Sequence, residues 1–100
     1  MQSIELSGRR TIDEADRTRA ELLEALSLAE EELVVDCSGL TEADLSLVQV
    51  LMAACRTAAA SGRRIIIPPP AADSPLEAVF AAAAVAPLWA PRREGDGGDA

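Results

Sequence analysis

The stretch that decides the fold is EELVVDCSGLTEADLSLVQVL, residues 31–51. It opens with an apolar run over residues 33–35, whose β-branched valines predict a buried strand. Ser38 and Gly39 follow, and this pair predicts a turn that ends the strand. From about residue 44 to residue 61, apolar residues recur at three- and four-residue steps, as in a helix with one buried face. The residues on that face are Leu47, Val48, Leu51, Ala54, Cys55 and Ala58.

The residues before this stretch predict another strand and another helix. Residues 3–8 alternate apolar and polar side chains, which indicates a half-exposed strand that ends at Gly8. Thr11 and Asp13 are both suitable N-cap residues for the helix that follows. That helix is predicted to end at about Leu28.

The helix of the opening stretch has clear signals at both ends. Asp44 is preferred over Thr41 as its N-cap, because residues 39–43 then form the connection from the strand. Gly62 is a suitable terminator. The isoleucines at 65–67 predict a third strand, apolar on both faces, of the kind found at a sheet centre or in a sheet covered on both sides.

The third strand is followed by strong punctuation. Three prolines at 68–70 stop it, because proline cannot donate to a ladder. Ser74, Pro75 and Glu77 then have the N-cap, N1 and N3 chemistry of a helix start. That last helix is predicted to end at Pro87.

Strands separated by helices indicate an α/β fold, with a parallel or mixed sheet and helices packed against it. One hundred residues make a single domain, which we expect to cover residues 1–91. Residues 92–100 have almost no apolar content and predict a disordered acidic, glycine-rich tail. Trp89 either folds back onto the core, which we favour, or is exposed as an anchor.

The composition of the chain argues against several classes of function. The formal charge is −8, from 17 acids and 9 bases, and the pI near 4.4 argues against binding of nucleic acid or of an anionic membrane surface. The chain has no histidine, so Ser-His-Asp and Cys-His catalysis cannot be assembled. Cys37 and Cys55 do not make a metal site and read as buried hydrophobic residues. We therefore expect no enzyme, cofactor or metal. The chain opens with no secretory signal, which favours a cytoplasmic setting.

Asp44-Leu45-Ser46 is the segment with the clearest functional content. Its serine lies near unpaired backbone N–H groups at the positive end of the helix dipole, where a phosphate is electrostatically favoured. An unmodified first-turn serine is the plainer reading. Asp44 is first of all a helix cap, and Asp36 either contributes to a binding surface or caps N–H groups of the turn.

The chain resembles the STAS domain family over roughly residues 3–86, in the manner of a small stand-alone bacterial member. This family includes anti-sigma factor antagonists and the cytoplasmic domains of sulfate transporters. The matching features are a strand ending in glycine, an acidic helix start, an Asp-x-Ser-Gly strand end, a serine motif at the next helix and a later strand. They lie at residues 6–8, 11–15, 36–39, 44–48 and 64–67.

In the antagonist branch, a partner anti-sigma kinase phosphorylates the second serine of an Asp-Ser-Ser-Gly motif. The resemblance places that serine at Ser46 and matches Asp44 to the acidic residue. Leu45 replaces the first serine, and Leu47 replaces the glycine. The resemblance implies a regulatory module that binds a serine kinase or anti-sigma-type partner. The expected contact residues are Asp36, Ser38, Asp44, Leu45 and Leu47.

A second hypothesis remains open. The chain could be an accessory subunit of a larger complex, of the lipid-transport ABC type or the chemotaxis signalling type, without any phosphorylation. Constitutive association with that complex, insensitive to changes at Ser46, distinguishes the two.

Overall fold

The computed structural model describes residues 2–89 and has the predicted α/β class, with three parallel strands in the order β1-β2-β3. The expected domain end at residue 91 and the tail 92–100 lie outside the described residues. The elements are β1 (Gln2–Arg10), a 3₁₀ turn η1 (Ile12–Glu14), α1 (Ala15–Leu28), β2 (Glu32–Ala43), α2 (Leu45–Ala60), β3 (Arg64–Ile66) and α3 (Pro75–Ala83).

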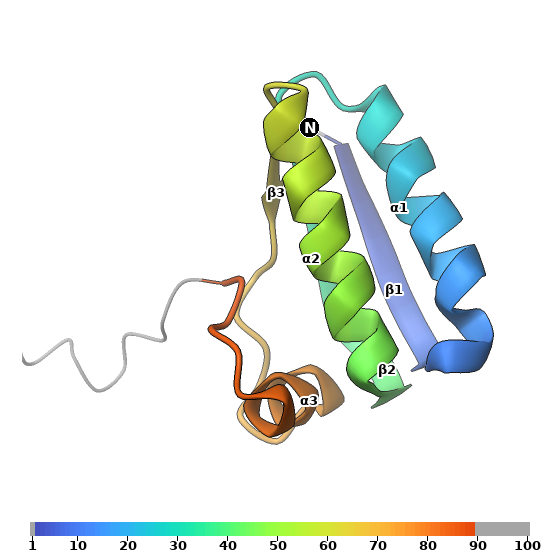
Figure 1. Cartoon of the computed structure of the whole chain (residues 1–100), viewed down its shortest axis with the longest axis vertical. Coiled ribbons are helices and arrows are strands. Elements are labelled where there is room, and N and C mark those ends of the chain that lie inside the picture. Colours follow the sequence, from blue (N-terminus) through green and yellow to red (C-terminus); the bar gives the residue numbers. More distant parts are fainter. Residues whose placement is uncertain (1, 90–100) are drawn as a thin grey trace, which may run out of the picture.

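The two long helices cover one face of the sheet. α1 and α2 lie side by side across it, and α3 lies beyond the end of β3, in contact with both β2 and α2 (Figure 1). On β1, Leu6 is buried beneath the helices, whereas Ser3, Glu5 and Ser7 point to the other face and are exposed. The second face of the sheet is therefore open to solvent, as the alternation of β1 predicted.

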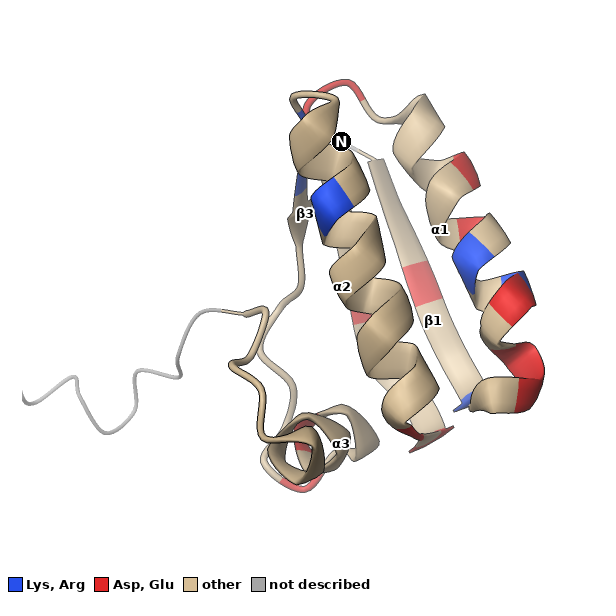
Figure 2. Ribbon diagram, in the orientation of Figure 1, with Lys and Arg blue, Asp and Glu red and all other residues tan. Residues whose placement is uncertain are grey.

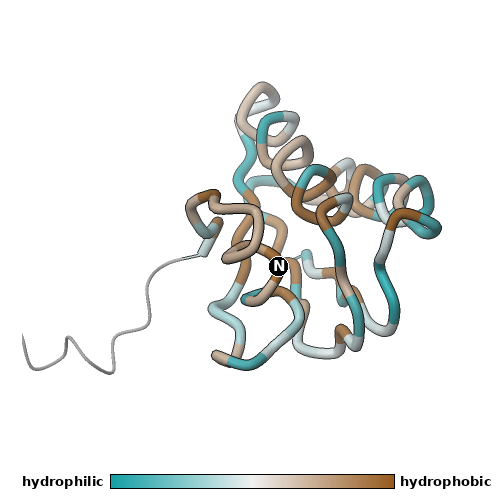
Figure 3. Tube along the Cα trace, turned by 60° about the horizontal axis from the view of Figure 1, so that its bottom comes forward, coloured by the Kyte–Doolittle hydropathy of each residue, from teal (hydrophilic) through white to brown (hydrophobic). Residues whose placement is uncertain are grey.

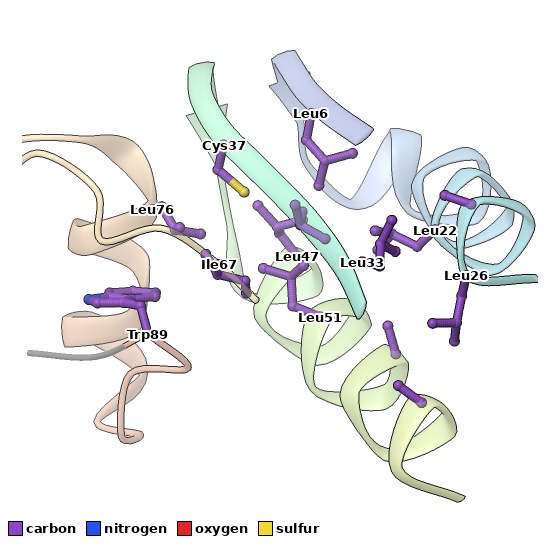
Figure 4. Close-up of a cluster of buried hydrophobic side chains, with 14 of the residues drawn as sticks. Leu6, Leu22, Leu26, Leu33, Cys37, Leu47, Leu51, Ile67, Leu76 and Trp89 are labelled. Atoms are coloured by element: carbon purple, nitrogen blue, oxygen red, sulfur yellow. The ribbon is translucent and has the colours of Figure 1, made fainter. Parts of the chain in front are cut away.

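The core lies between the sheet and the three helices (Figure 4). Along the chain trace, apolar residues recur at short intervals on strands and helices and alternate with hydrophilic ones (Figure 3). Of the residues predicted for the buried face of the helix in the opening stretch, all but Cys55 are buried, and Cys55 is half-buried. The largest fully buried side chains are Phe80, Leu6, Leu22, Leu33, Leu47, Leu51, Leu76, Val35, Val48 and Thr18.

β2 is longer than the sequence predicted. Ser38 and Gly39 do not turn the chain, because the strand continues to Ala43. In the pairing with β1, Glu5 and Ser7 lie opposite Asp36 and Gly39, so β2 contains one extra residue at this point. A β-bulge thus accommodates the Ser-Gly pair, and it brings both Cys37 and Leu40 to the buried face although they are three residues apart.

β3 is an edge strand, which corrects the expectation for residues 65–67. It pairs only with β2, and Ile65 and Ile66 are only half-buried. The pairing stops after three residues, and the prolines at 68–70 follow at once. A short edge strand followed by prolines offers little unpaired backbone to other chains.

Several local predictions are confirmed. Asp44 caps α2, and Gly62 follows that helix with φ of +76°. The Ser74 hydroxyl accepts a hydrogen bond from Glu77 N at 3.1 Å at the start of α3. Trp89 folds back onto the core, where its ring meets that of Phe80 edge-to-face with centroids 4.9 Å apart.

Two predicted ends are wrong. β1 continues past Gly8 to Arg10, because Arg9 and Arg10 still pair with β2, and Gly8, with φ of +73°, lies at a register shift within the strand. α3 ends at Ala83 rather than Pro87, because Ala84 has a left-handed conformation with φ of 56°.

Neither Thr11 nor Asp13 caps α1 directly, because η1 separates them from it. The Glu14 carboxylate accepts hydrogen bonds from Thr11 N and Oγ1, at 3.0 and 2.9 Å. Asp13 instead pairs with Arg9 at 2.9 Å.

A buried arginine fixes the end of β1 against α1. Arg10 is 8% exposed, and its guanidinium donates to Ser7 O at 3.1 Å, Thr18 Oγ1 at 3.1 Å and Glu21 Oε1 at 2.7 Å. These bonds compensate the cost of burying the charge. They also set where the chain leaves β1 and enters η1, beside the candidate site.

Candidate functional site

One carboxylate organises the start of α2. Asp44 Oδ1 accepts hydrogen bonds from Ser46 N at 3.0 Å and from Ser46 Oγ at 2.5 Å. Asp44 Oδ2 accepts one from Ile12 N at 3.0 Å. The predicted cap therefore also ties η1, which lies 32 residues earlier in the chain, to the first turn of α2.

These donors favour the ionised form of the carboxyl group. The hydrogen bond from the Ser46 hydroxyl is the main cause of the lowered pKa of Asp44, and the backbone N–H of Ile12 contributes in the same direction. Asp44 is therefore charged at neutral pH and remains an acceptor for all its partners.

Ser46 is held rather than free. The residue is 8% exposed, and the Ser46 hydroxyl donates a hydrogen bond to Asp44 Oδ1. The residue lies at the second position of α2, as the sequence predicted. Its low exposure limits the access of a kinase to this oxygen.

Two exposed apolar side chains flank this bonded group. Leu45 is 53% exposed and Ile12 is 67% exposed, and the bond between Ile12 N and Asp44 brings their backbones together. Leu47, in contrast, is 2% exposed and belongs to the core, so it offers no surface to a partner. Sequence reasoning missed Ile12, although an isoleucine between Thr11 and Asp13 was a usable signal.

The surroundings of this apolar pair are mainly acidic. Glu42, Asp13, Glu14 and Asp16 lie at the end of β2, in η1 and at the start of α1, with Arg9 as their basic neighbour (Figure 2). Arg9 has a raised pKa because of the charge of Glu14, followed by its hydrogen bond to Glu14. The local charge is therefore negative even after this pairing.

Asp36 and Ser38 lie elsewhere. Asp44 lies eight positions after Asp36, along a strand that rises about 3.3 Å per residue and is shortened by its bulges, so the two aspartates are on the order of 20 Å apart. Asp36 Oδ1 accepts a hydrogen bond from Ser38 N at 2.9 Å, and this bond is the main cause of the lowered pKa of Asp36. The contact residues expected from the sequence therefore lie in two separate regions, one at Asp36 and Ser38 and the other at the start of α2.

The Asp36 region borders a small cavity of about 140 Å³ between β2 and the proline-rich segment. Burial of the Cys37 thiol in its wall raises the pKa of Cys37 to about 12, so this thiol is unreactive at neutral pH. The lining residues are Asp36, Cys37, Ser38, Pro68, Pro69, Pro70, Ala71 and Ser74.

Residues 2–89 contain no group of three or more histidine, cysteine or acidic side chains arranged to hold a metal ion. In the same part of the chain, no helix combines the length and apolar character needed to cross a membrane.

Comparison with known proteins adds the family. No curated protein matches the chain. The family model described as Mlab, STAS domain matches residues 2–88, which is nearly the whole described chain. The chain therefore belongs to the STAS domain family, whose members are generally non-enzymatic regulatory modules that act through protein contacts.

Proposed function

We propose that this protein is a cytoplasmic regulatory module that binds a partner protein through the start of α2, under the control of phosphorylation at Ser46. The partner is a serine kinase of the anti-sigma type or a related signalling kinase. The shared Asp44 carboxylate, with Ser46 on one oxygen and Ile12 on the other, is the observation that carries this proposal.

The surface has the character of a small recognition site. Ile12 and Leu45 offer apolar area of the kind that partner contacts bury, in an acidic surrounding. The complementary partner has an apolar pocket with Arg or Lys residues at its rim. Asp36 and Ser38 belong to a second contact, which only a partner extending along β2 reaches.

The phosphorylation step is ordinary phosphoryl transfer from ATP. A P–O bond forms to Ser46 Oγ, the bond from the γ-phosphorus to the bridging oxygen of ADP breaks, and the hydroxyl proton passes to a base of the kinase. The product carries about −1.5 to −2 additional charge at the positive end of α2.

The occupied hydroxyl of Ser46 favours a second candidate function. A serine that is 8% exposed and bonded to its own cap is poorly placed for a kinase. An accessory subunit that binds a larger complex constitutively, as in transporter or chemotaxis assemblies, uses the same apolar pair without modification.

The first experiment combines mass and binding. The protein is co-expressed with candidate kinases from its host, and its intact mass and the peptides covering residues 38–56 are measured. Phosphate on Ser46, together with partner binding that Ser46 phosphorylation changes at least about tenfold, supports the switch. Partner binding without phosphate, unchanged in Ser46→Ala, supports the accessory subunit.

A matched pair of variants tests the surface itself. Leu45→Ser should weaken partner binding, whereas Leu28→Ser should not. Leu28 is equally apolar and 65% exposed, but it lies at the C-terminal end of α1, away from η1 and the start of α2. Equal losses in both variants contradict the proposed surface.

A further inference from the structure

We infer that Asp44 couples the state of Ser46 to the position of Ile12. Phosphate on Ser46 displaces the Asp44 carboxylate, releases the N–H of Ile12 and separates Ile12 from Leu45. The inference rests on the proposed function, because it describes how the proposed modification changes the proposed binding surface.

The first step is the sharing of one rigid group. The two oxygens of a carboxylate belong to one rigid planar group, so a movement of Oδ1 away from Ser46 also changes the position of Oδ2 relative to Ile12 N. Both serine donors converge on Oδ1, at 3.0 Å for the backbone nitrogen and 2.5 Å for the hydroxyl. Any group added to that hydroxyl is placed against the carboxylate.

The second step is the chemistry of the added group. Phosphorylation removes the hydroxyl proton that Ser46 donates to Asp44, and it places a second anion beside an ionised carboxylate. The phosphate oxygens also accept N–H groups of the first helical turn, so they replace Asp44 as the cap. The carboxylate thus loses two donors and gains a repulsive neighbour.

The third step concerns what else holds η1. The other described polar contacts of this turn are local, since they join Glu14 to Thr11 and Arg9 to Asp13 and Glu14. Ile12 itself is 67% exposed, so packing anchors it weakly. Among the described hydrogen bonds, only the one from Ile12 N to Asp44 joins η1 to the start of α2.

The consequence is regulation by geometry as well as by charge. In the unmodified protein, one carboxylate holds Ile12 and Leu45 as a pair. In the phosphorylated protein, Ile12 moves away from α2 within the limits that the hydrogen bonds of Arg10 and its pairing with Ala43 set. A partner that needs both side chains then loses one of them, even where it tolerates the added charge.

The test uses NMR on the full chain with phosphoserine inserted at position 46 during translation, so that no natural kinase or partner is needed. The amide proton of Ile12 is followed by its chemical shift and its exchange with solvent. We expect it to shift upfield and to exchange at least about tenfold faster than in the unmodified protein, with the amide of buried Leu51 unchanged.

Phosphoserine at Ser38 is the matched control. Ser38 also follows an aspartate by two residues and donates its N–H to it, but no described bond links that aspartate to Ile12. Asp44→Ala should release the Ile12 amide, whereas Ser46→Ala should retain it, because Ser46 N still donates to Asp44.

An Ile12 amide that is unchanged by phosphate at Ser46 overturns the inference. So does an equal change from phosphate at Ser38. Failure to find phosphate or a partner in cells contradicts the proposed function instead. It does not affect the NMR result, which needs neither a kinase nor a partner.

Discussion

The chain contains two Asp-x-Ser segments, at residues 36–38 and 44–46, with the same local hydrogen bond and opposite surroundings. In each, the aspartate accepts the serine N–H two residues later, at 2.9 and 3.0 Å. In the first, the middle residue Cys37 is buried and the serine is exposed. In the second, the middle residue Leu45 is exposed and the serine is buried.

The difference shows that the local motif does not by itself define a site. At residues 36–38 the hydrogen bond supports a bulge within a strand, and the aspartate side chain accepts no described hydrogen bond from a distant segment. At residues 44–46 the strand has ended and a helix begins, which leaves the second carboxylate oxygen free to reach Ile12. Of the two aspartate side chains, only that of Asp44 accepts a described hydrogen bond from a distant part of the chain. Four experiments can break or sharpen this comparison.

The largest expected effect is on thiol reactivity in the first segment. Cys37 is 6% exposed with a pKa raised to about 12, whereas Cys55 is only half-buried. At pH 8 a thiol reagent should modify Cys55 on the order of 100-fold faster than Cys37. Single Cys→Ser variants, each keeping one thiol, allow the two rates to be measured separately. Similar rates indicate that the bulge opens readily and contradict the comparison.

The next effect is on the bulge itself. A Cβ atom at Gly39 lies 3.0 Å from Ser7 Cβ and 3.4 Å from Glu5 Oε2. Gly39→Val should therefore lower the free energy of unfolding by about 3 kcal/mol, from overpacking. Ser38→Val next to it should change stability by about 0.5 kcal/mol or less, because Ser38 is exposed.

Chemical denaturation followed by Trp89 fluorescence measures both variants. Adding Ser7→Gly to Gly39→Val should recover part of the loss, since it removes the nearest clashing atom. No recovery shows that the strain arises elsewhere.

A smaller effect separates the two aspartates. Asp44→Ala removes a helix cap and the bond to Ile12, and should cost about 2 kcal/mol of stability. Asp36→Ala removes one local bond and should cost about 1 kcal/mol. The same denaturation experiment measures both. Equal costs mean that the link to Ile12 adds nothing to stability.

The smallest effect is on pH dependence. Both aspartates have lowered pKa values in the folded protein, so each stabilises the fold above the ordinary carboxyl pKa near 4 and loses that contribution as pH falls through its lowered value. Asp44→Asn should flatten the decline in stability below pH 4 more than Asp36→Asn, because the Asp44 carboxylate accepts hydrogen bonds from more donors than that of Asp36. Denaturation curves at pH 7 and pH 3 measure this. A steeper decline in Asp44→Asn contradicts the assignment.

Most of the fold could be predicted because its signals are local. The caps at Asp44 and Ser74 and the glycine after α2 depend on residues within one turn, and all three are present. The helix and strand periods depend on which side chains avoid water, which the alternation of residues reveals directly. The family match over residues 2–88 agrees with this reading.

Two of the errors have one physical cause, since both depend on a neighbouring strand. A Ser-Gly pair can form a turn or a bulge, and the pairing of Gly39 beside Ser7 decides for the bulge. The isoleucine run was predicted to lie at a sheet centre or in a sheet covered on both faces, but β3 pairs with β2 alone, and Ile65 and Ile66 are only half-buried. Composition alone does not reveal how many strands a sheet has.

The candidate site divides in the same way. By itself, the sequence determined the cap at Asp44 and the serine that it holds, because an N-cap side chain accepts a hydrogen bond from the backbone N–H two positions later. Only the tertiary structure decided that Asp36 lies far from Asp44 and that Ile12 joins the site. The physical reason is that a carboxylate has two oxygens. Local sequence selects the donor for one, and the packing of η1 against α2 selects the donor for the other.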